Sequence, residues 1–356
     1  MVQTQQGLLL SVVAPCYNEE ESLRQFCQRV SDACRAQVGS SFEIVLVDDG
    51  SRDRTWPIIE DLSATNPNIL GVRLFRNHGH QLAATAGLSV TRGERVMPID
   101  ADLQDPPELL PEMMSLMDQG ADVVYCQRVS REGEGWFKLL TASLFYRLIE
   151  KISPTPIPRD TGDFRLMNRR VVDALNMMPE HHRFLRGMVS WIGGKQVALP
   201  YERQSRFAGT TKYPLRKMIR FATDAITSFS IVPLRLAAWL GVCVSAVAFL
   251  TLFYVLFQWL TGAKVPGWAS ELASNSLFAG TQLLVLGIIG EYLGRAVEEL
   301  KGRPLFMIGK INAQGQVFDL PIEFSRLRPE QEKAVLNQIV PVSSPNAHGR
   351  NLRMRS

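Results

Sequence analysis

Residues 8–125 alternate short apolar runs with longer segments in which apolar side chains recur every three or four positions. The apolar runs indicate β-strands, and the longer pattern is typical of amphipathic helices. The predicted strands are residues 8–14, 43–47, 70–75, 95–99 and 122–126. The predicted helices are residues 19–36, 55–64, 80–90 and 108–119. This order predicts an α/β fold in which helices cover both faces of a mostly parallel sheet.

Two long apolar stretches follow the α/β segment. Residues 236–260 contain no charged side chain, and residues 272–290 contain none before Glu291. Each stretch is long enough to cross the hydrocarbon core of a bilayer as a helix. We therefore predict two transmembrane helices here. Two buried helices of a soluble protein are the less favoured alternative.

Basic side chains lie on one side of both predicted spans. The loop between the spans holds only Lys264 and Glu271, whereas the flanking segments are rich in Lys and Arg. The positive-inside rule therefore predicts that the α/β domain and both termini are cytoplasmic. Residues 215–229 have the pattern of an amphipathic helix with basic residues such as Arg216 and Arg220, which suits a membrane surface.

Length and composition limit the remaining possibilities. A chain of 356 residues can hold an α/β domain of about 200–250 residues together with a membrane segment. The formal net charge of +4 gives no indication of a nucleic-acid partner.

The five cysteines form no CxxC pair and have no histidine at zinc spacing, so we expect them to be small core residues in a reducing cytosol. The N-terminus lacks a basic segment and is interpreted as the first strand, not as a signal peptide.

The strongest candidate for chemistry lies at the end of the fourth predicted strand. Asp100 and Asp102 follow residues 95–99 directly, and ligands of parallel sheets bind beyond the carboxyl ends of the strands. Two carboxylates that flank the small Ala101 can hold Mg²⁺ or Mn²⁺, to which Gln104 could add an amide oxygen. Such a cation would in turn bind a diphosphate. The alternative is a solvated turn.

The first two strands end in further candidate residues. Asp48 and Asp49 precede a Gly-Ser pair and either form a simple turn or accept hydrogen bonds from a base or ribose. After the first strand, Tyr17 could stack on a base. Glu19 begins a predicted helix, where a favourable interaction with the helix dipole is the simpler interpretation.

Three motifs together resemble those of family 2 glycosyltransferases. They are Pro15-Cys16-Tyr17-Asn18-Glu19-Glu20, Val47-Asp48-Asp49-Gly50-Ser51 and Asp100-Ala101-Asp102-Leu103-Gln104-Asp105-Pro106-Pro107. Three more segments narrow the resemblance to polyprenyl-phosphate glycosyltransferases, especially the two-span bactoprenol glucosyltransferases of bacteria. These are Asp163-Phe164-Arg165-Leu166, Arg206-Phe207-Ala208-Gly209-Thr210-Thr211-Lys212-Tyr213 and Gly290-Glu291-Tyr292-Leu293-Gly294-Arg295. Dolichol-phosphate mannose synthase is a more distant relative, and the resemblance covers roughly residues 8–310.

The resemblance implies a GT-A-like, Rossmann-type sheet and a role for each matching residue. The donor nucleotide would contact Pro15, Tyr17, Glu19, Val47, Asp48, Asp49, Asp100 and Ala101. The metal ligands would be Asp100, Asp102 and Gln104. Donor or lipid phosphate would contact Arg128, Arg206 and Lys212. The reaction centre would hold Asp163 and Asp102.

Alternatives stay open for several of these residues. Arg206 and Lys212 could merely touch anionic headgroups. Asp163 could form a structural ion pair with Arg165 or Arg159. The histidines are expected to be surface or core residues, not ligands, and they include His78, which stands where the family commonly has an aromatic residue. Thr211 replaces a usual Ser and keeps the hydroxyl.

The resemblance also implies a function and a domain organisation. Residues 1–212 would be the cytoplasmic catalytic domain, 213–235 a membrane-surface helix, 236–295 the two spans, and 296–356 a cytoplasmic C-terminal segment and tail. The enzyme, a multi-pass protein of the bacterial inner membrane, would transfer a hexose, best glucose, from a UDP-sugar to undecaprenyl phosphate with inversion. A homo-oligomer, a tetramer in related proteins, is also implied.

Other functions remain to be separated from this one. Transfer of an aminoarabinose derivative or of mannose differs only in the sugar. A processive polysaccharide synthase would share the first three motifs, but the sequence lacks a Gln-X-X-Arg-Trp segment. A non-catalytic membrane scaffold would need no metal. Because an acceptor phosphate is already an anion near neutral pH, lipid-phosphate transfer needs little help from a general base.

Overall fold

The computed structural model describes residues 7–129, 158, 161–202, 232–261 and 267–319. The chain divides into two compact units. The first contains a sheet with its flanking helices, and the described part of the second consists of two long helices. The predicted amphipathic helix at 215–229 and the polar tail lie outside the described residues.

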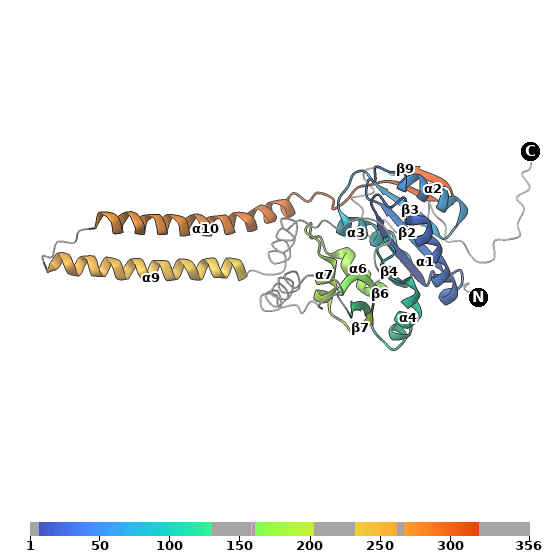
Figure 1. The fold of residues 1–356 in the computed structure, drawn as a ribbon, viewed down its shortest axis with the longest axis horizontal. Helices are drawn as coiled ribbons and strands as arrows, with labels where there is room; N and C mark the ends of the chain where they lie inside the picture. Colours follow the sequence, from blue (N-terminus) through green and yellow to red (C-terminus); the bar gives the residue numbers. More distant parts are fainter. Residues whose placement is uncertain (1–6, 130–157, 159–160, 203–231, 262–266, 320–356) are drawn as a thin grey trace, which may run out of the picture. The chain divides into compact units, whose positions relative to one another are not determined.

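The first unit is built on a nine-stranded sheet in the described residues, with the order β7-β5-β6-β4-β1-β2-β3-β8-β9 (Figure 1). Its strands are β1 (Leu10–Cys16), β2 (Phe42–Asp48), β3 (Ile69–Leu74), β4 (Arg95–Pro98), β5 (Val123–Arg128), β6 (Thr161–Asn168), β7 (Gln196–Tyr201), β8 (Ile308–Ala313) and β9 (Gln316–Asp319). The four central strands β4, β1, β2 and β3 run parallel. The predicted α/β sheet with flanking helices is confirmed, and all five predicted strands are present.

Helices cover both faces of this sheet. One face carries α1 (Leu23–Val38), α2 (Thr55–Thr65) and α4 (Leu110–Asp118), which follows the short η1 (Pro107–Leu109). The other elements are α3 (His80–Val90), α6 (Arg169–Met177) and α7 (Leu185–Ile192), which contact one another or the sheet. The predicted helix at residues 19–36 begins later, at Leu23, because residues 19–22 form a turn in which Ser22 N donates to Glu19 O at 3.2 Å.

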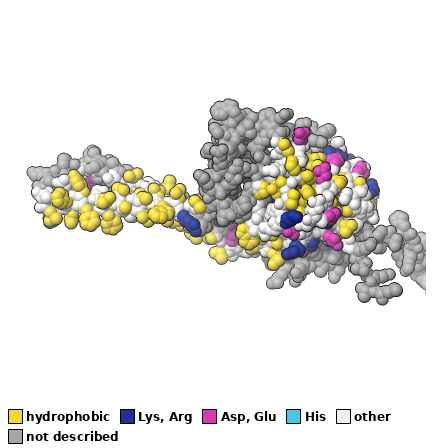
Figure 2. Space-filling view, turned by 90° about the horizontal axis from the view of Figure 1, so that it is seen from below, with side chains coloured by type: hydrophobic (Ala, Val, Ile, Leu, Met, Phe, Trp, Pro, Cys, Tyr) yellow, Lys and Arg dark blue, Asp and Glu magenta, His cyan; other side chains and the backbone are white. Residues whose placement is uncertain are grey.

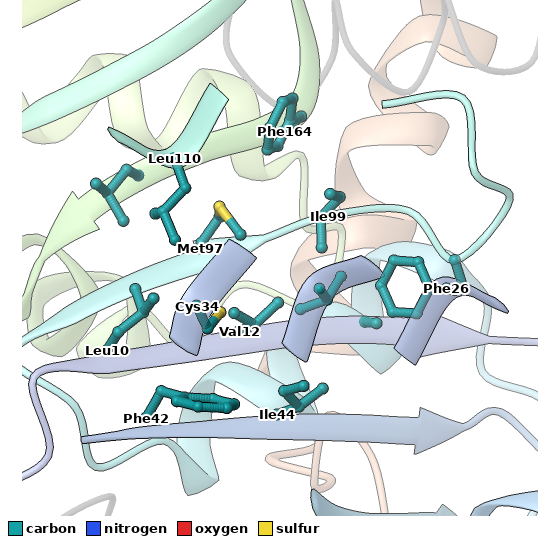
Figure 3. Close-up of a cluster of buried hydrophobic side chains, with 14 of the residues drawn as sticks. Leu10, Val12, Phe26, Cys34, Phe42, Ile44, Met97, Ile99, Leu110 and Phe164 are labelled. Atoms are coloured by element: carbon teal, nitrogen blue, oxygen red, sulfur yellow. The ribbon is translucent and has the colours of Figure 1, made fainter. Parts of the chain in front are cut away.

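The core beneath α1 draws on alternate positions of the central strands. Leu10 and Val12 of β1 and Ile44 of β2 face Phe26 and Cys34 of α1, and all five side chains are buried (Figure 3). Side chains of this size each contribute about 1.5–3 kcal/mol when they leave water. The apolar runs of the sequence therefore specify the scaffold.

Helix α3 lies unusually close to the opposite face of the sheet. A Cβ atom at Gly87 would be 2.3 Å from Val13 Cγ1 and 2.9 Å from Val47 Cγ2, so only glycine fits between helix and strands. This close packing fixes α3 over β1 and β2. The first residues of α3 are thereby held at the carboxyl edge of the sheet.

The antiparallel strand β6 brings a later part of the chain to the same edge. Its last residues, Met167 and Asn168, pair with the first residues of β4, Val96 and Arg95. The first residues of β6 consequently extend past the carboxyl end of β4. Asp163 is therefore placed next to the loop that follows β4.

Strands β8 and β9 correct the predicted domain organisation. Sequence analysis placed residues 296–356 in a segment outside the catalytic domain, but β8 pairs with β3 and belongs to the sheet. Ile308 and Ile311 of β8 are fully buried. The strands are short and follow a long helix, so their apolar pattern is weak. Their pairing partner lies more than two hundred residues earlier in the sequence.

The second unit contains α9 (Val232–Leu260) and α10 (Trp268–Leu300), which run side by side (Figure 1). Both contain a segment long and apolar enough to cross a membrane, Val232–Gln258 and Leu277–Leu300, with none of the apolar window buried. Figure 2 shows hydrophobic side chains along these helices. The second segment begins and ends later than predicted and includes Glu291, which pairs with Arg295 at 2.9 Å. Such a pair lowers the cost of charge in an apolar segment.

Candidate active site

The Asp-X-Asp segment forms a fixed turn at the end of β4. Asp102 Oδ1 accepts a hydrogen bond from Gln104 N at 3.2 Å. Leu103 has φ +62°, a conformation that bulky side chains rarely adopt, and its side chain is buried. Ala101 is buried as well, whereas the Asp100 side chain is 29% exposed. Strained backbone of this kind is characteristic of functional sites.

Negative charge accumulates around this turn. Burial raises the pKa of Asp100 to about 6, and the charges of Asp163, Asp105 and Asp102 add to the rise, while His80 opposes it. A divalent cation would relieve this repulsion. Among the described residues no group of three or more His, Cys, Asp or Glu side chains could hold a metal. The two carboxylates and Gln104 therefore fit Mg²⁺ or Mn²⁺ only if substrate and water complete the coordination.

Asp163 is held from three directions. Arg186 Nε donates to Oδ1 at 2.9 Å, Gln81 Nε2 donates to Oδ2 at 2.8 Å, and His80 Nε2 lies 3.2 Å from Oδ2. Burial alone would raise the pKa of Asp163, but Arg186, His80 and Arg165 together hold it well below its usual range. The carboxylate is consequently a fixed, ionised hydrogen-bond acceptor.

The alternative considered for Asp163 was a structural ion pair with Arg165 or Arg159. In the structure, Asp163 pairs with a different arginine. Arg165 acts on Asp163 through its charge and donates instead to Gly162 O at 3.0 Å. Arg159 lies outside the described residues. The direct partner, Arg186 of α7, was not identified from the sequence. The motif around residues 163–166 gave no signal for it.

His80, the first residue of α3, was expected to be a surface or core residue. Its Nε2 lies 3.3 Å from Asp100 Oδ1 as well as 3.2 Å from Asp163 Oδ2. Burial lowers its pKa, but the hydrogen bond to Asp163 and the charges of both carboxylates outweigh this and raise the pKa to about 8. The only sequence signal was its position after a strand at the carboxyl edge.

The two acidic residues at the carboxyl end of β2 hold neighbouring loops. Asp49 accepts hydrogen bonds from the backbone N–H groups of His78 at 2.7 Å and Gly79 at 2.9 Å, one on each oxygen. The fully buried Asp48 accepts from Ser51 N at 2.9 Å and lies 3.2 Å from Arg73 Nε. Both carboxylates thus fix the loops after β2 and β3. Their contact with a nucleoside stays a prediction.

The loop after β1 is tied to the loop after β2 by an unpredicted residue. Asn18, at φ +57°, donates from its backbone to Ser51 Oγ at 3.0 Å and accepts from Arg52 N at 3.0 Å. Glu19 accepts from Ser22 Oγ at 2.8 Å, which agrees with a role in starting α1.

The other residues predicted for the nucleoside pocket differ in exposure. Pro15 and Val47 are buried within their strands, so their side chains belong to the core. Tyr17 is 42% exposed. Of these three residues, only Tyr17 has a side chain available to stack on a base.

Arg128, predicted to lie near phosphate, ends β5 at the same edge. Its Nε donates to Tyr201 Oη at 3.4 Å, and Tyr201 Oη donates to Asp105 Oδ1 at 2.6 Å. A Cβ atom on Gly162 would lie 3.1 Å from Arg128 Nη2, so the guanidinium lies against the residue before Asp163. Arg206 and Lys212 lie outside the described residues.

This arrangement defines a class of protein. The loops after β1 and β2 and the acidic turn after β4 all lie at the carboxyl edge of the parallel central strands, where α/β sheets of this kind bind their ligands. Residues 11–175 match the family model described as glycosyl transferase family 2. The chain is 45% identical over 301 residues to the uncharacterized glycosyltransferase YkcC of Bacillus subtilis (strain 168), covering 84% of this chain and 93% of that protein. The chain therefore belongs to glycosyltransferase family 2 and is a glycosyltransferase.

Other relatives and solved structures are similar over much of the chain. The prophage bactoprenol glucosyl transferase homolog of Escherichia coli (strain K12) is 39% identical over 303 residues, which cover 85% of this chain and 99% of that protein. The bactoprenol glucosyl transferase of Shigella phage SfII is 38% identical over 302 residues, covering 85% and 97%. A structure of S. aureus TarS with UDP-GlcNAc has a TM-score of 0.40 at 20% identity and covers 61% of this chain and 66% of that one. The glucosyl-3-phosphoglycerate synthase of Mycobacterium tuberculosis, solved with Mn²⁺ and UDP-glucose, has a TM-score of 0.41 at 19% identity, covering 62% and 77%.

Proposed function

We propose that this enzyme transfers a hexose, best assigned as glucose, from a UDP-sugar to a polyprenyl phosphate such as undecaprenyl phosphate. The observation that carries the proposal is the acidic turn at Asp100 beside the anchored Asp163, in a chain with two helices of membrane-spanning length. Relatives named bactoprenol glucosyl transferase support a lipid acceptor. The site of reaction would be the cytoplasmic face of the bacterial inner membrane.

Asp100, Asp102 and Gln104 would hold Mg²⁺ or Mn²⁺. When bound, the cation would neutralise the charge that develops on the departing diphosphate. The turn at Leu103, with its positive φ and buried side chain, would keep the two carboxylates in place before substrate arrives. Such preorganisation avoids a reorganisation cost during the reaction.

Asp163 would act by position and charge, not as a proton acceptor. The acceptor phosphate is already an anion, so it needs no strong base. Arg186 and Gln81 both donate to the Asp163 carboxylate, which supports a fixed orientation beside the sugar or acceptor. Attack on the anomeric carbon from the side opposite the leaving group would invert its configuration.

The basic residues would complete the site. Arg128 would contact phosphate from the end of β5, and its position against Gly162 supports this. Arg206 and Lys212 would screen the repulsion between acceptor phosphate and donor diphosphate. Tyr17, Glu19, Asp48 and Asp49 would lie around the nucleoside. Assembly as a homo-oligomer is part of the same proposal.

The direct test is a panel of UDP- and GDP-sugars incubated with the purified full chain, undecaprenyl phosphate and Mg²⁺ or Mn²⁺. We expect a lipid-linked hexose from UDP-glucose, and another productive donor would reassign the sugar. Asp102→Asn should abolish transfer while the protein stays folded. Asp32→Asn, on the exposed face of α1, is the matched control and should remain active. A panel in which no donor yields a lipid-linked sugar would overturn the proposal.

A further inference from the structure

A single nitrogen of His80 stands between the two acidic parts of the site. Nε2 lies 3.3 Å from Asp100 Oδ1 and 3.2 Å from Asp163 Oδ2. An imidazole nitrogen carries one hydrogen, so it can make one well-aligned hydrogen bond at a time. Asp100 and Asp163 therefore compete for the same donor.

Asp163 has independent support. Gln81 Nε2 donates to Asp163, and the carbonyl end of the same amide accepts from Leu185 N at 2.9 Å. Arg186 Nε donates to Asp163 while its Nη1 donates to Thr161 O at 2.9 Å. Because both donors are themselves fixed, Asp163 keeps its position whichever carboxylate His80 contacts.

His80 has more freedom than its partners. Its side chain is 43% exposed, against 7% for Asp163, and it belongs to the first turn of α3. The backbone of α3 is fixed by the close approach at Gly87, so any adjustment falls on the His80 side chain. The imidazole can thus shift between two carboxylates that themselves stay in place.

We propose that His80 is a positioning residue that couples occupancy of the cation site at Asp100 and Asp102 to the environment of Asp163. His80 Nε2 is hydrogen-bonded to Asp163 at 3.2 Å while Asp100 Oδ1 competes for it at 3.3 Å. A cation on Asp100 would weaken this competing acceptor, so that His80 donates more fully to the anion at the reaction centre when the donor side is loaded. This inference deepens the proposed function and rests on its cation site.

Coupling of this kind is reciprocal. Asp163→Asn leaves His80 with a weaker acceptor at that position, so His80 turns to Asp100 and competes with the cation. The substitution also removes a negative charge, which weakens cation binding whether or not His80 is present. Asp163→Asn therefore weakens cation binding both in the wild type and in a variant that lacks the His80 imidazole. The difference between these two losses of affinity is the part transmitted by His80, and a double-mutant cycle measures it.

The experiment measures Mn²⁺ affinity of the full chain by electron paramagnetic resonance in the presence of saturating UDP, with a protein-free Mn²⁺–UDP sample as the blank. We expect Asp163→Asn to weaken Mn²⁺ binding in both the wild type and the His80→Ala background. The fold-loss of affinity should be about 3–10 times larger in the wild type. Asp105→Asn is the matched control, because Asp105 also raises the pKa of Asp100 while its carboxylate accepts a hydrogen bond from Tyr201 Oη at 2.6 Å. Its effect should be equal in both backgrounds.

Activity supplies a second readout. We expect His80→Ala to bind Mn²⁺ at least as tightly as the wild type yet to lose kcat, with a smaller change in donor KM. His80→Gln, whose amide carries two hydrogens and can reach two acceptors, should recover part of the kcat if the alanine variant folds poorly. Equal effects of Asp163→Asn in both backgrounds would overturn the coupling alone. A wild type that transfers sugar without binding Mn²⁺ or Mg²⁺ would instead overturn the proposed cation site.

Discussion

Asp100 is placed where its negative charge opposes folding. Its pKa is about 6 in the folded protein against an ordinary value of 3.8, chiefly because of burial. A raised pKa of an acid means that the ionised form is less favourable in the folded than in the unfolded state, here by about 1–3 kcal/mol at neutral pH. We expect Asp100→Asn to raise the Tm of the metal-free protein by about 2–6 °C. Thermal unfolding in detergent with a chelator checks this.

The shift in the pKa of Asp100 also determines how the gain in Tm from Asp100→Asn depends on pH. As pH falls through about 6, folded Asp100 binds a proton before the unfolded chain does, and the penalty shrinks until both forms are protonated below about pH 4. The difference in Tm between Asp100→Asn and wild type should therefore be full above pH 6 and small near pH 4. A difference that stays constant between pH 4 and 8 would contradict the assigned cause.

Gly162 controls the position of a residue proposed to contact phosphate. An added methyl group would lie 3.1 Å from Arg128 Nη2, closer than comfortable packing allows. We expect Gly162→Ala to displace the guanidinium and lower kcat/KM by about 3- to 10-fold, a change of about 1 kcal/mol, with little loss of stability. Steady-state kinetics and thermal unfolding together check this. Gly7→Ala is the control, since nothing lies within 4 Å of its added atom, and it should change neither quantity.

Sequence identified the parts of the site that are contiguous along the chain. Asp100, Asp102 and Asp48 each follow an apolar strand directly, so their place at the carboxyl edge follows from the topology. The residues that hold Asp163 could not be found this way. His80 and Gln81 lie 83 and 82 positions before it and Arg186 lies 23 positions after it, on two different helices. No local pattern encodes such meetings.

At the scale of elements, the continuous apolar runs of the central strands were sufficient to predict them. A strand buried on both faces needs apolar residues at nearly every position, and β1 and β2 are buried throughout. Strands β6 to β9 were not assigned, because they lie beside charged site residues or at the sheet edge. Strand β8 pairs with β3 and is also tied to α2, where Ser63 Oγ donates to Asn312 O at 3.3 Å across 249 positions of sequence.

The inclusion of β8 in the sheet can be tested by one pair of substitutions. Ile311 is fully buried in β8, whereas Val317 in β9 is 43% exposed. We expect Ile311→Ala to lower the free energy of unfolding of the catalytic unit by about 2–5 kcal/mol, and Val317→Ala to change it by less than about 0.5 kcal/mol. Urea denaturation followed by tryptophan fluorescence gives both values. Equal, small effects would mean that β8 does not pack on the sheet in solution.

At the scale of the whole molecule, the sheet constrains the path of the chain through a membrane. Strand β3 precedes both candidate spans in sequence and β8 follows both, yet the two strands are hydrogen-bonded neighbours. Residues on either side of the helical pair must therefore be on the same side of any membrane that the helices cross. Two spans satisfy this condition and one does not. The excess of Lys and Arg outside the connecting loop predicts that this side is the cytoplasm.

Two spans with a cytoplasmic catalytic domain can be distinguished from a single-span or surface-bound arrangement. A fluorescent protein fused to the C-terminus should fluoresce in bacterial cells, because it stays in the cytoplasm with β8. Alkaline phosphatase inserted at Lys264, between α9 and α10, should be active, because it is exported. A matched insertion at Gly315, in the turn between β8 and β9, should give no phosphatase activity. Activity at Gly315, or inactivity at Lys264 in a membrane-bound protein, would contradict two spans with a cytoplasmic catalytic domain.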